Sequence, residues 1–175
     1  MLYFTDMSFN THTGLIIGNL FSLLSAICLA VSAMKKSKKK MMLWQSCDAA
    51  FGILANAFLC AYAAMVISLI CFIRNVLSYR DKMNKTATCV FLLLGVVAGA
   101  CANNLGAVGW LPITAAAVYT VCIWLTVNEQ QMRYALIVNL LLWFAHCVFV
   151  KAVPSAVVTL TLCLWTAIQA VKKRK

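Results

Sequence analysis

Acidic residues are scarce in this chain: it has four, against fifteen lysines and arginines, over 175 residues, and its net charge is +11. Proline occurs twice, and charged residues make up 11% of the sequence, whereas about a quarter is usual in soluble domains. Hydrophobic residues make up 64%, which is more than a water-soluble globule contains. The composition therefore excludes a highly solvated surface, and we expect an all-α membrane protein.

Signatures of catalysis are also missing. The sequence has no GxSxG, no HExxH, no paired membrane aspartates and no glycine-rich phosphate loop. Its nine cysteines all lie in apolar runs and form no CxxC pair, so we interpret them as small packing residues rather than metal ligands. We expect no enzyme, no cofactor and no metal. The remaining enzymatic alternative is an acid–base pair of Asp48 and His146, whose predicted depths in the membrane differ.

The basic residues lie in short clusters between apolar runs, at residues 35–40 (KKSKKK), 80–85 and 172–175. Membrane proteins mark cytoplasmic loops in this way, whereas nucleic-acid binding requires a basic face. We therefore predict contacts with anionic headgroups of the inner leaflet and no nucleic-acid partner. The amino terminus would lie outside and the carboxyl terminus in the cytoplasm, with fourteen of the fifteen basic residues near the cytoplasmic side and Lys151 as the exception.

Two long apolar stretches resemble each other. Residues 41–79 are too long for one membrane crossing and must form two spans, and residues 131–169 form a weaker copy ninety positions later. At this offset Asn56 aligns with His146. The turn signals of the second copy, Lys151 and Pro154, then place the turn of the first copy at residues 61–64.

Adding the other apolar runs gives one transmembrane domain over residues 1–175, with seven helices. Repeat one covers 14–79, a linker helix covers 86–104, and repeat two covers 110–171. The layout is three, one and three helices, and the odd number of crossings between the copies makes the two repeats parallel.

Ionisable groups inside a membrane are costly, so each one is a candidate functional residue. Asp48 and Arg74 fall at similar depth on adjacent antiparallel helices, and we predict that they form a buried ion pair. The pair could serve as a gate or counter-ion for a charged solute, or it could be a structural clamp. Asn139 lies at the matching depth on the sixth span.

Further polar residues lie along the spans. Asn56 and His146 are predicted nearer the outer face, where the histidine could carry protons or hydrogen-bond across helices. In the first span Asn19, Ser22 and Ser25 recur at helical spacing and form a mildly polar face.

Gly95 and Gly99 on the linker helix form a GxxxG pattern, which lets helices approach closely. This pattern predicts either a homo-oligomer or internal packing of the bundle.

Several runs resemble the YgjV family of bacterial inner-membrane proteins. They are CFIRNVLSYR at 71–80, WLP at 110–112, MRY at 132–134 and WFAH at 143–146. The similarity covers almost the whole chain and implies a multi-pass protein of the bacterial inner (plasma) membrane. It implies no established activity.

The three-one-three layout is also similar to that of the SWEET and PQ-loop transporters and of the vitamin-precursor transporter PnuC. This resemblance implies a small-solute pocket between two bundles and a proline hinge on the first helix of each repeat. Pro112 fits that position in repeat two, whereas the first span has Gly14 and Gly18 instead. The helices that would line the pocket carry Asn75, Trp165 and Thr166.

The leading hypothesis is a small-solute transporter or facilitator that works by alternating access. The alternative is a non-transporting structural or regulatory membrane protein that acts through helix contacts. The predicted polar core, or substrate pathway, consists of Asp48, Asn56, Arg74, Asn75, Asn139 and His146.

Overall fold

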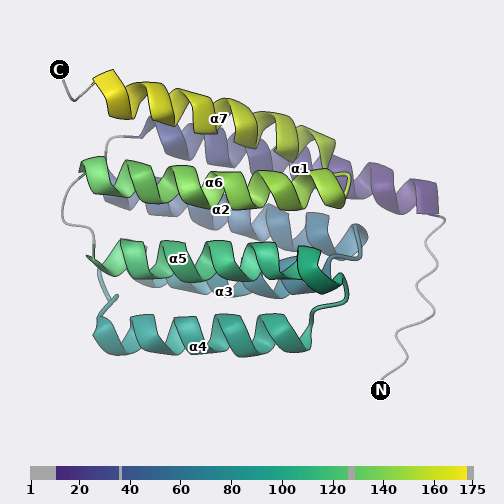
Figure 1. Ribbon diagram of the computed structural model, residues 1–175, viewed down its shortest axis with the longest axis horizontal. Helices are drawn as coiled ribbons and strands as arrows, with labels where there is room; N and C mark the ends of the chain where they lie inside the picture. The colour runs from purple at the N-terminus through teal and green to yellow at the C-terminus, as the bar shows by residue number, and fades with distance from the viewer. Residues whose placement is uncertain (1–10, 36, 126–128, 173–175) are drawn as a thin grey trace.

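The computed structural model describes residues 11–35, 37–125 and 129–172 (Figure 1). The described residues form seven α-helices and one short 3₁₀-helix and contain no strand, which confirms the all-helical prediction. The elements are α1 (Thr11–Met34), α2 (Lys38–Phe58), α3 (Tyr62–Tyr79), α4 (Lys85–Cys101), η1 (Gly106–Gly109), α5 (Trp110–Leu125), α6 (Glu129–Phe149) and α7 (Val153–Lys172).

The helices form two layers with one helix at the edge. Figure 1 shows α1, α2 and α3 side by side in one layer and α7, α6 and α5 in the other. The layers meet where α1 packs on α7 and where α3 packs on α5, and α4 packs against both α3 and α5. The middle helices of the two layers, α2 and α6, pack closely against their neighbours within each layer but not against each other. They are therefore the place where an internal space can form.

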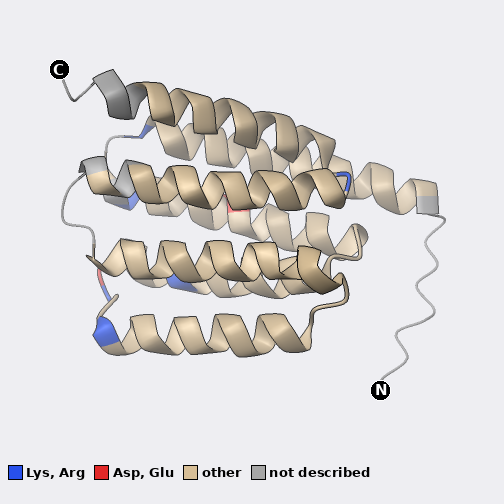
Figure 2. Ribbon diagram, in the orientation of Figure 1, with Lys and Arg blue, Asp and Glu red and all other residues tan. Residues whose placement is uncertain are grey.

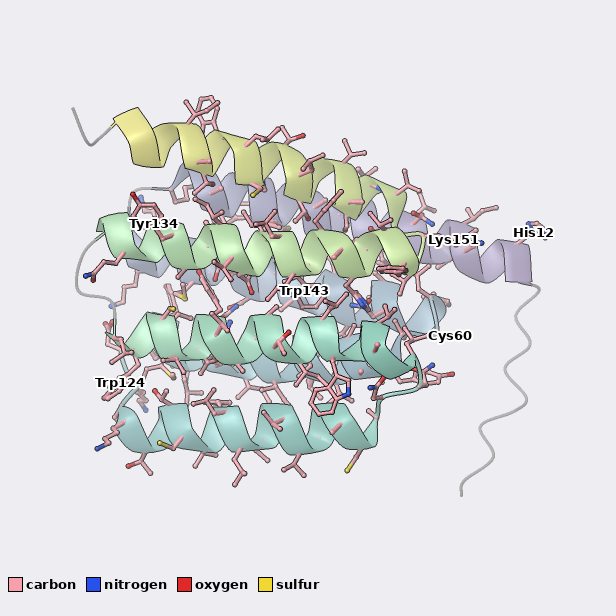
Figure 3. All side chains as sticks on the ribbon, in the orientation of Figure 1. His12, Cys60, Trp124, Tyr134, Trp143 and Lys151 are labelled. Atoms are coloured by element: carbon pink, nitrogen blue, oxygen red, sulfur yellow. The ribbon has the colours of Figure 1, made fainter. Side chains whose placement is uncertain are left out.

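Successive helices run in opposite directions, so the bundle has two distinct ends (Figure 1). Lysine and arginine gather at the end where α1 and α3 finish and α2 and α4 begin (Figure 2). We call this the basic end. The basic residues there whose side chains the structure describes are Lys35, Lys39, Lys40, Arg80, Lys82 and Lys85. The opposite, or far, end carries the α2–α3 and α6–α7 turns, where Figure 3 labels Cys60 and Lys151.

The two turns at the far end have the same backbone geometry. Cys60 and Lys151 both adopt the left-handed conformation, with φ of 54° and 59°. The next N–H in each turn reaches back over the turn: Ala61 donates to the carbonyl of Asn56 and Ala152 to that of Cys147, both at 2.9 Å. This is the Schellman arrangement, here built without the glycine that usually occupies its left-handed position.

These turns correct two sequence predictions. The α2–α3 turn occupies residues 59–61 rather than 61–64, because α3 already begins at Tyr62. The hydrogen bonds also align the hairpins at an offset of 91 residues (147 − 56 and 152 − 61), so Asn56 corresponds to Cys147 and not to His146. One residue of slip rotates a helix position by about 100°, which places the side chain on a different face.

The outward surface of the bundle is apolar. Large hydrophobic side chains are exposed on every helix, among them Leu20, Leu93, Leu141 and Leu164, each at least 48% exposed. Three segments of the described chain are long and apolar enough to cross a membrane: His12–Met34, Tyr62–Tyr79 and Gly106–Leu125. The stretches Lys85–Cys101, Tyr134–Phe149 and Val153–Ile168 are shorter apolar helices. Such a surface suits lipid better than water.

Both glycines of the GxxxG pattern are buried inside the bundle. A Cβ added to Gly99 would lie 2.8 Å from Cγ1 of Ile113 and 3.1 Å from Cδ1 of Ile67, whereas one added to Gly95 would have Ile67 at 3.9 Å. Gly99 therefore lets α4 lie close against α3 and α5. Internal packing accounts for the contacts of both glycines, and assembly into oligomers stays a prediction.

Candidate functional site: a polar cavity between the two layers

An internal cavity of about 110 Å³ lies between the two layers. Its wall includes residues from α1, α2, α3, α5, α6 and α7. A liquid water molecule takes up about 30 Å³, so the space has room for about four waters. Polar and charged side chains contribute much of this wall, although the bundle around it is largely apolar.

Five of the six residues predicted for the polar core line this cavity. They come from three helices: Asp48 and Asn56 from α2, Arg74 and Asn75 from α3, and Asn139 from α6. Their role as a substrate pathway stays a prediction. His146, the sixth residue, is not part of the cavity wall.

Arg74 is 3% exposed and held by neutral partners. Its Nε and Nη2 donate to Oδ1 of Asn75 at 3.2 and 2.9 Å, and its Nη1 donates to Oγ1 of Thr120 on α5 at 2.8 Å. The guanidinium carbon also lies 5.4 Å from the ring centroid of Tyr119, a favourable cation–π position. A guanidinium has five N–H donors, so these bonds leave part of its donor capacity unused.

Asp48 is held from the opposite side. Its Oδ1 accepts a hydrogen bond of 2.5 Å from Oγ of Ser25 on α1. Its other carboxylate oxygen has no hydrogen-bond partner among the described residues. That oxygen is also not fully buried, because the fully buried side-chain atoms without a partner are the two ring nitrogens of His146. The free oxygen therefore has room for a donor from the cavity.

The predicted ion pair between Asp48 and Arg74 does not form. In the part of the chain that the structure describes, the one ion pair within 4.0 Å joins Lys39 and Asp81, 2.8 Å apart at the basic end. The two side chains do not meet because they point to different helices. Asp48 turns toward Ser25 on α1, whereas Arg74 turns toward Thr120 on α5. Both charges remain on the wall of one cavity.

The cavity faces of α2 and α6 follow the same pattern of positions. Asn139 on α6 has no hydrogen-bond partner among the described residues and corresponds to Asp48 at the offset of 91 (139 − 48). Every cavity residue of α6 corresponds in this way to a cavity residue of α2. The pairs are Gln45 and Leu136, Asp48 and Asn139, Ala49 and Leu140, Gly52 and Trp143, and Asn56 and Cys147.

His146 is 1% exposed and lies behind the cavity wall. Its ring stands edge-on to Trp143, a cavity residue, with centroids 5.7 Å apart. Figure 3 labels Trp143 midway along α6. Neither ring nitrogen of His146 has a partner at hydrogen-bonding distance and angle, although the backbone of Val108 in η1 lies beside the ring. The predicted hydrogen bond across helices is therefore not made in this structure.

Pro112 is buried in the first turn of α5. A proline at this position removes no hydrogen bond from the helix, because the first N–H groups of a helix have no partner within it. α5 continues unbroken from Trp110 to Leu125. The role of Pro112 as a hinge stays a prediction.

The polar face predicted on the first span contacts the rest of the bundle. Ser22 exchanges hydrogen bonds with Ser155 on α7, including one of 2.7 Å between their hydroxyl oxygens, and Ser25 binds Asp48. Sequence reasoning missed Thr120 and the bond from Nε2 of Gln45 to the hydroxyl of Tyr119, 3.1 Å long. Single polar residues in apolar helices give no periodic signal, so nothing in the sequence singled them out.

Two asparagines clamp the turns at the far end. The amide of Asn19 on α1 donates to the carbonyl of Lys151 at 3.3 Å and accepts from the N–H of Val153 at 3.1 Å. The amide of Asn104, after α4, donates to the carbonyl of Cys60 at 2.6 Å and accepts from the N–H of Tyr62 at 3.2 Å. Each clamp ties one hairpin turn to a segment outside its own hairpin.

No group of three or more His, Cys, Asp or Glu side chains comes together among the described residues, so this part of the chain offers no cluster for a metal ion. The available chemistry is hydrogen bonding and charge in a small space between the two layers. A helical bundle with an apolar exterior and a polar interior of this kind is an integral membrane protein.

The chain belongs to the Imp-YgjV family, described as bacterial inner membrane protein, whose family model matches residues 16–175. The resemblance drawn from the sequence is thereby confirmed, and the family places the protein in the bacterial inner membrane. No curated protein and no solved structure matched the chain.

Proposed function

We propose that the protein is a small-solute transporter or facilitator that works by alternating access, not an enzyme. The observation that carries the proposal is the polar cavity between the two helix layers. Burying charged and amide groups in a membrane is costly, and the cost is tolerated where such groups line a pathway. An unpaired aspartate and arginine on the wall of a solute-sized space fit that pattern.

The proposal treats α1–α3 and α5–α7 as two parallel three-helix repeats joined by α4. Three observations support this layout: the equivalent turns at Cys60 and Lys151, the 91-residue correspondence of the cavity faces, and the reciprocal contacts of α1 with α7 and of α3 with α5. A two-fold axis along the membrane normal would generate all three. Rocking of one repeat against the other would then open the cavity to alternate sides.

In the proposed topology all seven helices cross the membrane and the basic end faces the cytoplasm, with the amino terminus outside. Exposed aromatic residues support two interfacial belts. Trp124 and Tyr134 lie at the basic end (Figure 3), and Tyr62 and Trp110 begin helices at the far end. Anionic headgroups would then bind the exposed lysines of the basic end.

The test is solute uptake into liposomes that contain the purified protein. A screen of labelled small polar solutes should find at least one that enters faster than into empty liposomes. Arg74→Ala should abolish that uptake, whereas Leu93→Ala, on the lipid-facing side of α4, should leave it unchanged. Absence of uptake for every solute would favour the non-transporting alternative.

A second measurement addresses alternating access directly. In a background without the native cysteines, Asn139→Cys introduces a thiol on the cavity wall. Membrane-impermeant thiol reagents should reach it from either side of the membrane, with the balance shifting when solute is present. Reaction from one side under all conditions would contradict the rocking motion.

A further inference from the structure

The cavity carries two opposite charges that no protein group neutralises directly. Arg74 is held by Asn75 and Thr120, and Asp48 by Ser25, all neutral partners. Among the described residues neither charge has an ion-pair partner within 4.0 Å. In a low-dielectric interior, unpaired charges of this kind are strongly destabilising unless something in the space between them compensates.

Each charge keeps unused hydrogen-bonding capacity at the cavity. Asp48 has one carboxylate oxygen without a described partner, and Arg74 retains N–H donors beyond its three bonds. Asn139 adds an unpartnered amide from the facing helix. A ligand in this space would therefore meet an acceptor with negative charge, donors with positive charge, and a neutral amide.

We propose that the cavity binds a small zwitterion of the amino-acid type, with its ammonium group at Asp48 and its carboxylate at Arg74. The inference rests on the proposed transport function and names its substrate class. A ligand with both charges compensates both residues at once. A ligand with one charge leaves the other residue uncompensated, and a neutral polyol leaves both.

The size of the cavity limits the ligand. A cavity of about 150 Å³ holds benzene, which has six non-hydrogen atoms, so a volume of about 110 Å³ limits the ligand to about that size. Glycine, L-alanine and L-serine lie near this limit, whereas aromatic amino acids exceed it.

The experiment compares L-serine with two analogues that each lack one charge. Ethanolamine lacks the carboxylate and 3-hydroxypropanoate lacks the amine. Binding to the purified full-length protein in detergent would be measured by calorimetry, with glycine and L-alanine alongside. We expect L-serine to bind about tenfold to a hundredfold more tightly than either analogue, because each analogue loses one charge-assisted hydrogen-bond group.

A variant assigns the charges to their residues. Asp48→Asn keeps the shape of the side chain and removes its charge, so it should weaken the binding of L-serine by about tenfold or more without weakening that of 3-hydroxypropanoate, which has no ammonium group to place at Asp48. If the role of Asp48 were merely structural, the substitution would weaken the binding of both ligands equally. The melting temperature of the variant shows that it is folded.

Two results would overturn the inference: glycerol or a singly charged analogue binding as tightly as L-serine, or none of the three amino acids binding. Failure of the transport proposal looks different. L-serine that binds with the expected selectivity but never crosses the liposome membrane refutes transport and leaves the zwitterion site. Uptake of neutral solutes without binding of any zwitterion refutes the zwitterion site and leaves the transport proposal.

Discussion

The two halves of the molecule, α1–α3 and α5–α7, share their framework and differ in their chemistry. Each half has a hairpin turn with a non-glycine left-handed residue, and each turn is clamped by one asparagine amide. The charged side chains of the cavity wall, Asp48 and Arg74, in contrast, both belong to the first half. At the 91-residue offset Asp48 corresponds to Asn139 and Arg74 to Trp165 (165 − 74), which is 53% exposed. The turns and their clamps thus have counterparts in both halves, whereas the two charged side chains do not.

This difference separates the residues that hold the fold from those expected to act on a solute. The clamps and turns recur because both hairpins need them. Asp48 and Arg74 have no charged counterpart in the second half, and a charge in such a place lowers stability, so their presence requires a different explanation. The predictions below test this separation, beginning with the largest expected effect.

Replacing Arg74 by leucine should reduce solute uptake by about a hundredfold or more, because it removes the positive charge from the cavity wall and leaves Asn75 and Thr120 without their hydrogen-bond donor. Trp165→Leu, at the corresponding position of the second half, faces outward and should change uptake less than twofold by the same assay. Equal losses of uptake in the two variants would mean that the charge of Arg74 is not needed for transport.

The asparagine clamps should be equivalent. Asn19→Ala and Asn104→Ala each remove two hydrogen bonds to a turn, so each should destabilise the protein by about 1–3 kcal/mol. The double variant should show the sum, because the clamps lie on different turns. Reversible unfolding in detergent measures these costs, and a strongly unequal pair would contradict a duplicated framework.

α4 has no counterpart in either half, and its two glycines provide a matched test of its packing. Gly99→Ala would place a methyl group 2.8 Å from Ile113 and should cost about 1–3 kcal/mol through overpacking. Gly95→Ala has its nearest neighbour at 3.9 Å and should be neutral or slightly stabilising, because alanine favours helix. Melting temperatures of the two variants distinguish them, and equal shifts would contradict the close approach at Gly99.

Asn139→Asp places a second carboxylate at the position that corresponds to Asp48. It should raise the affinity for ethanolamine by about tenfold, as expected for one added charge-assisted hydrogen bond. Asn139→Ala is the control and should not raise it. Calorimetric titration of both variants checks the expectation, and an unchanged affinity would place residue 139 out of reach of the ligand.

Composition and apolar run length were sufficient to predict the helices, since a largely hydrophobic chain can satisfy its backbone in lipid only within such elements. The turn after α2 was displaced in the prediction because Cys60 adopts a conformation that sequence rules reserve for glycine. The same lack of a marker caused the one-residue error in the repeat alignment. That error is why His146 was expected to match Asn56.

The candidate site was predictable only as a set of residues. Sequence position predicts the depth of a residue in the membrane, and the three residues predicted at similar depth, Asp48, Arg74 and Asn139, line one cavity. It does not give the direction of a side chain. The competing neutral partners, Ser25 and Thr120, lie on other helices and decide where the two charges turn.

The helices at opposite edges of the bundle differ in length. α1 has 24 residues and α4 has 17, which correspond to about 36 Å and 26 Å, while a bilayer core is about 30 Å thick. In the proposed topology the bilayer is therefore thinned beside α4, or the whole bundle tilts to accommodate both edges. Acyl-chain length should then shift the thermal stability of the reconstituted protein, which makes membrane thickness a physical variable that acts on this protein without binding to it.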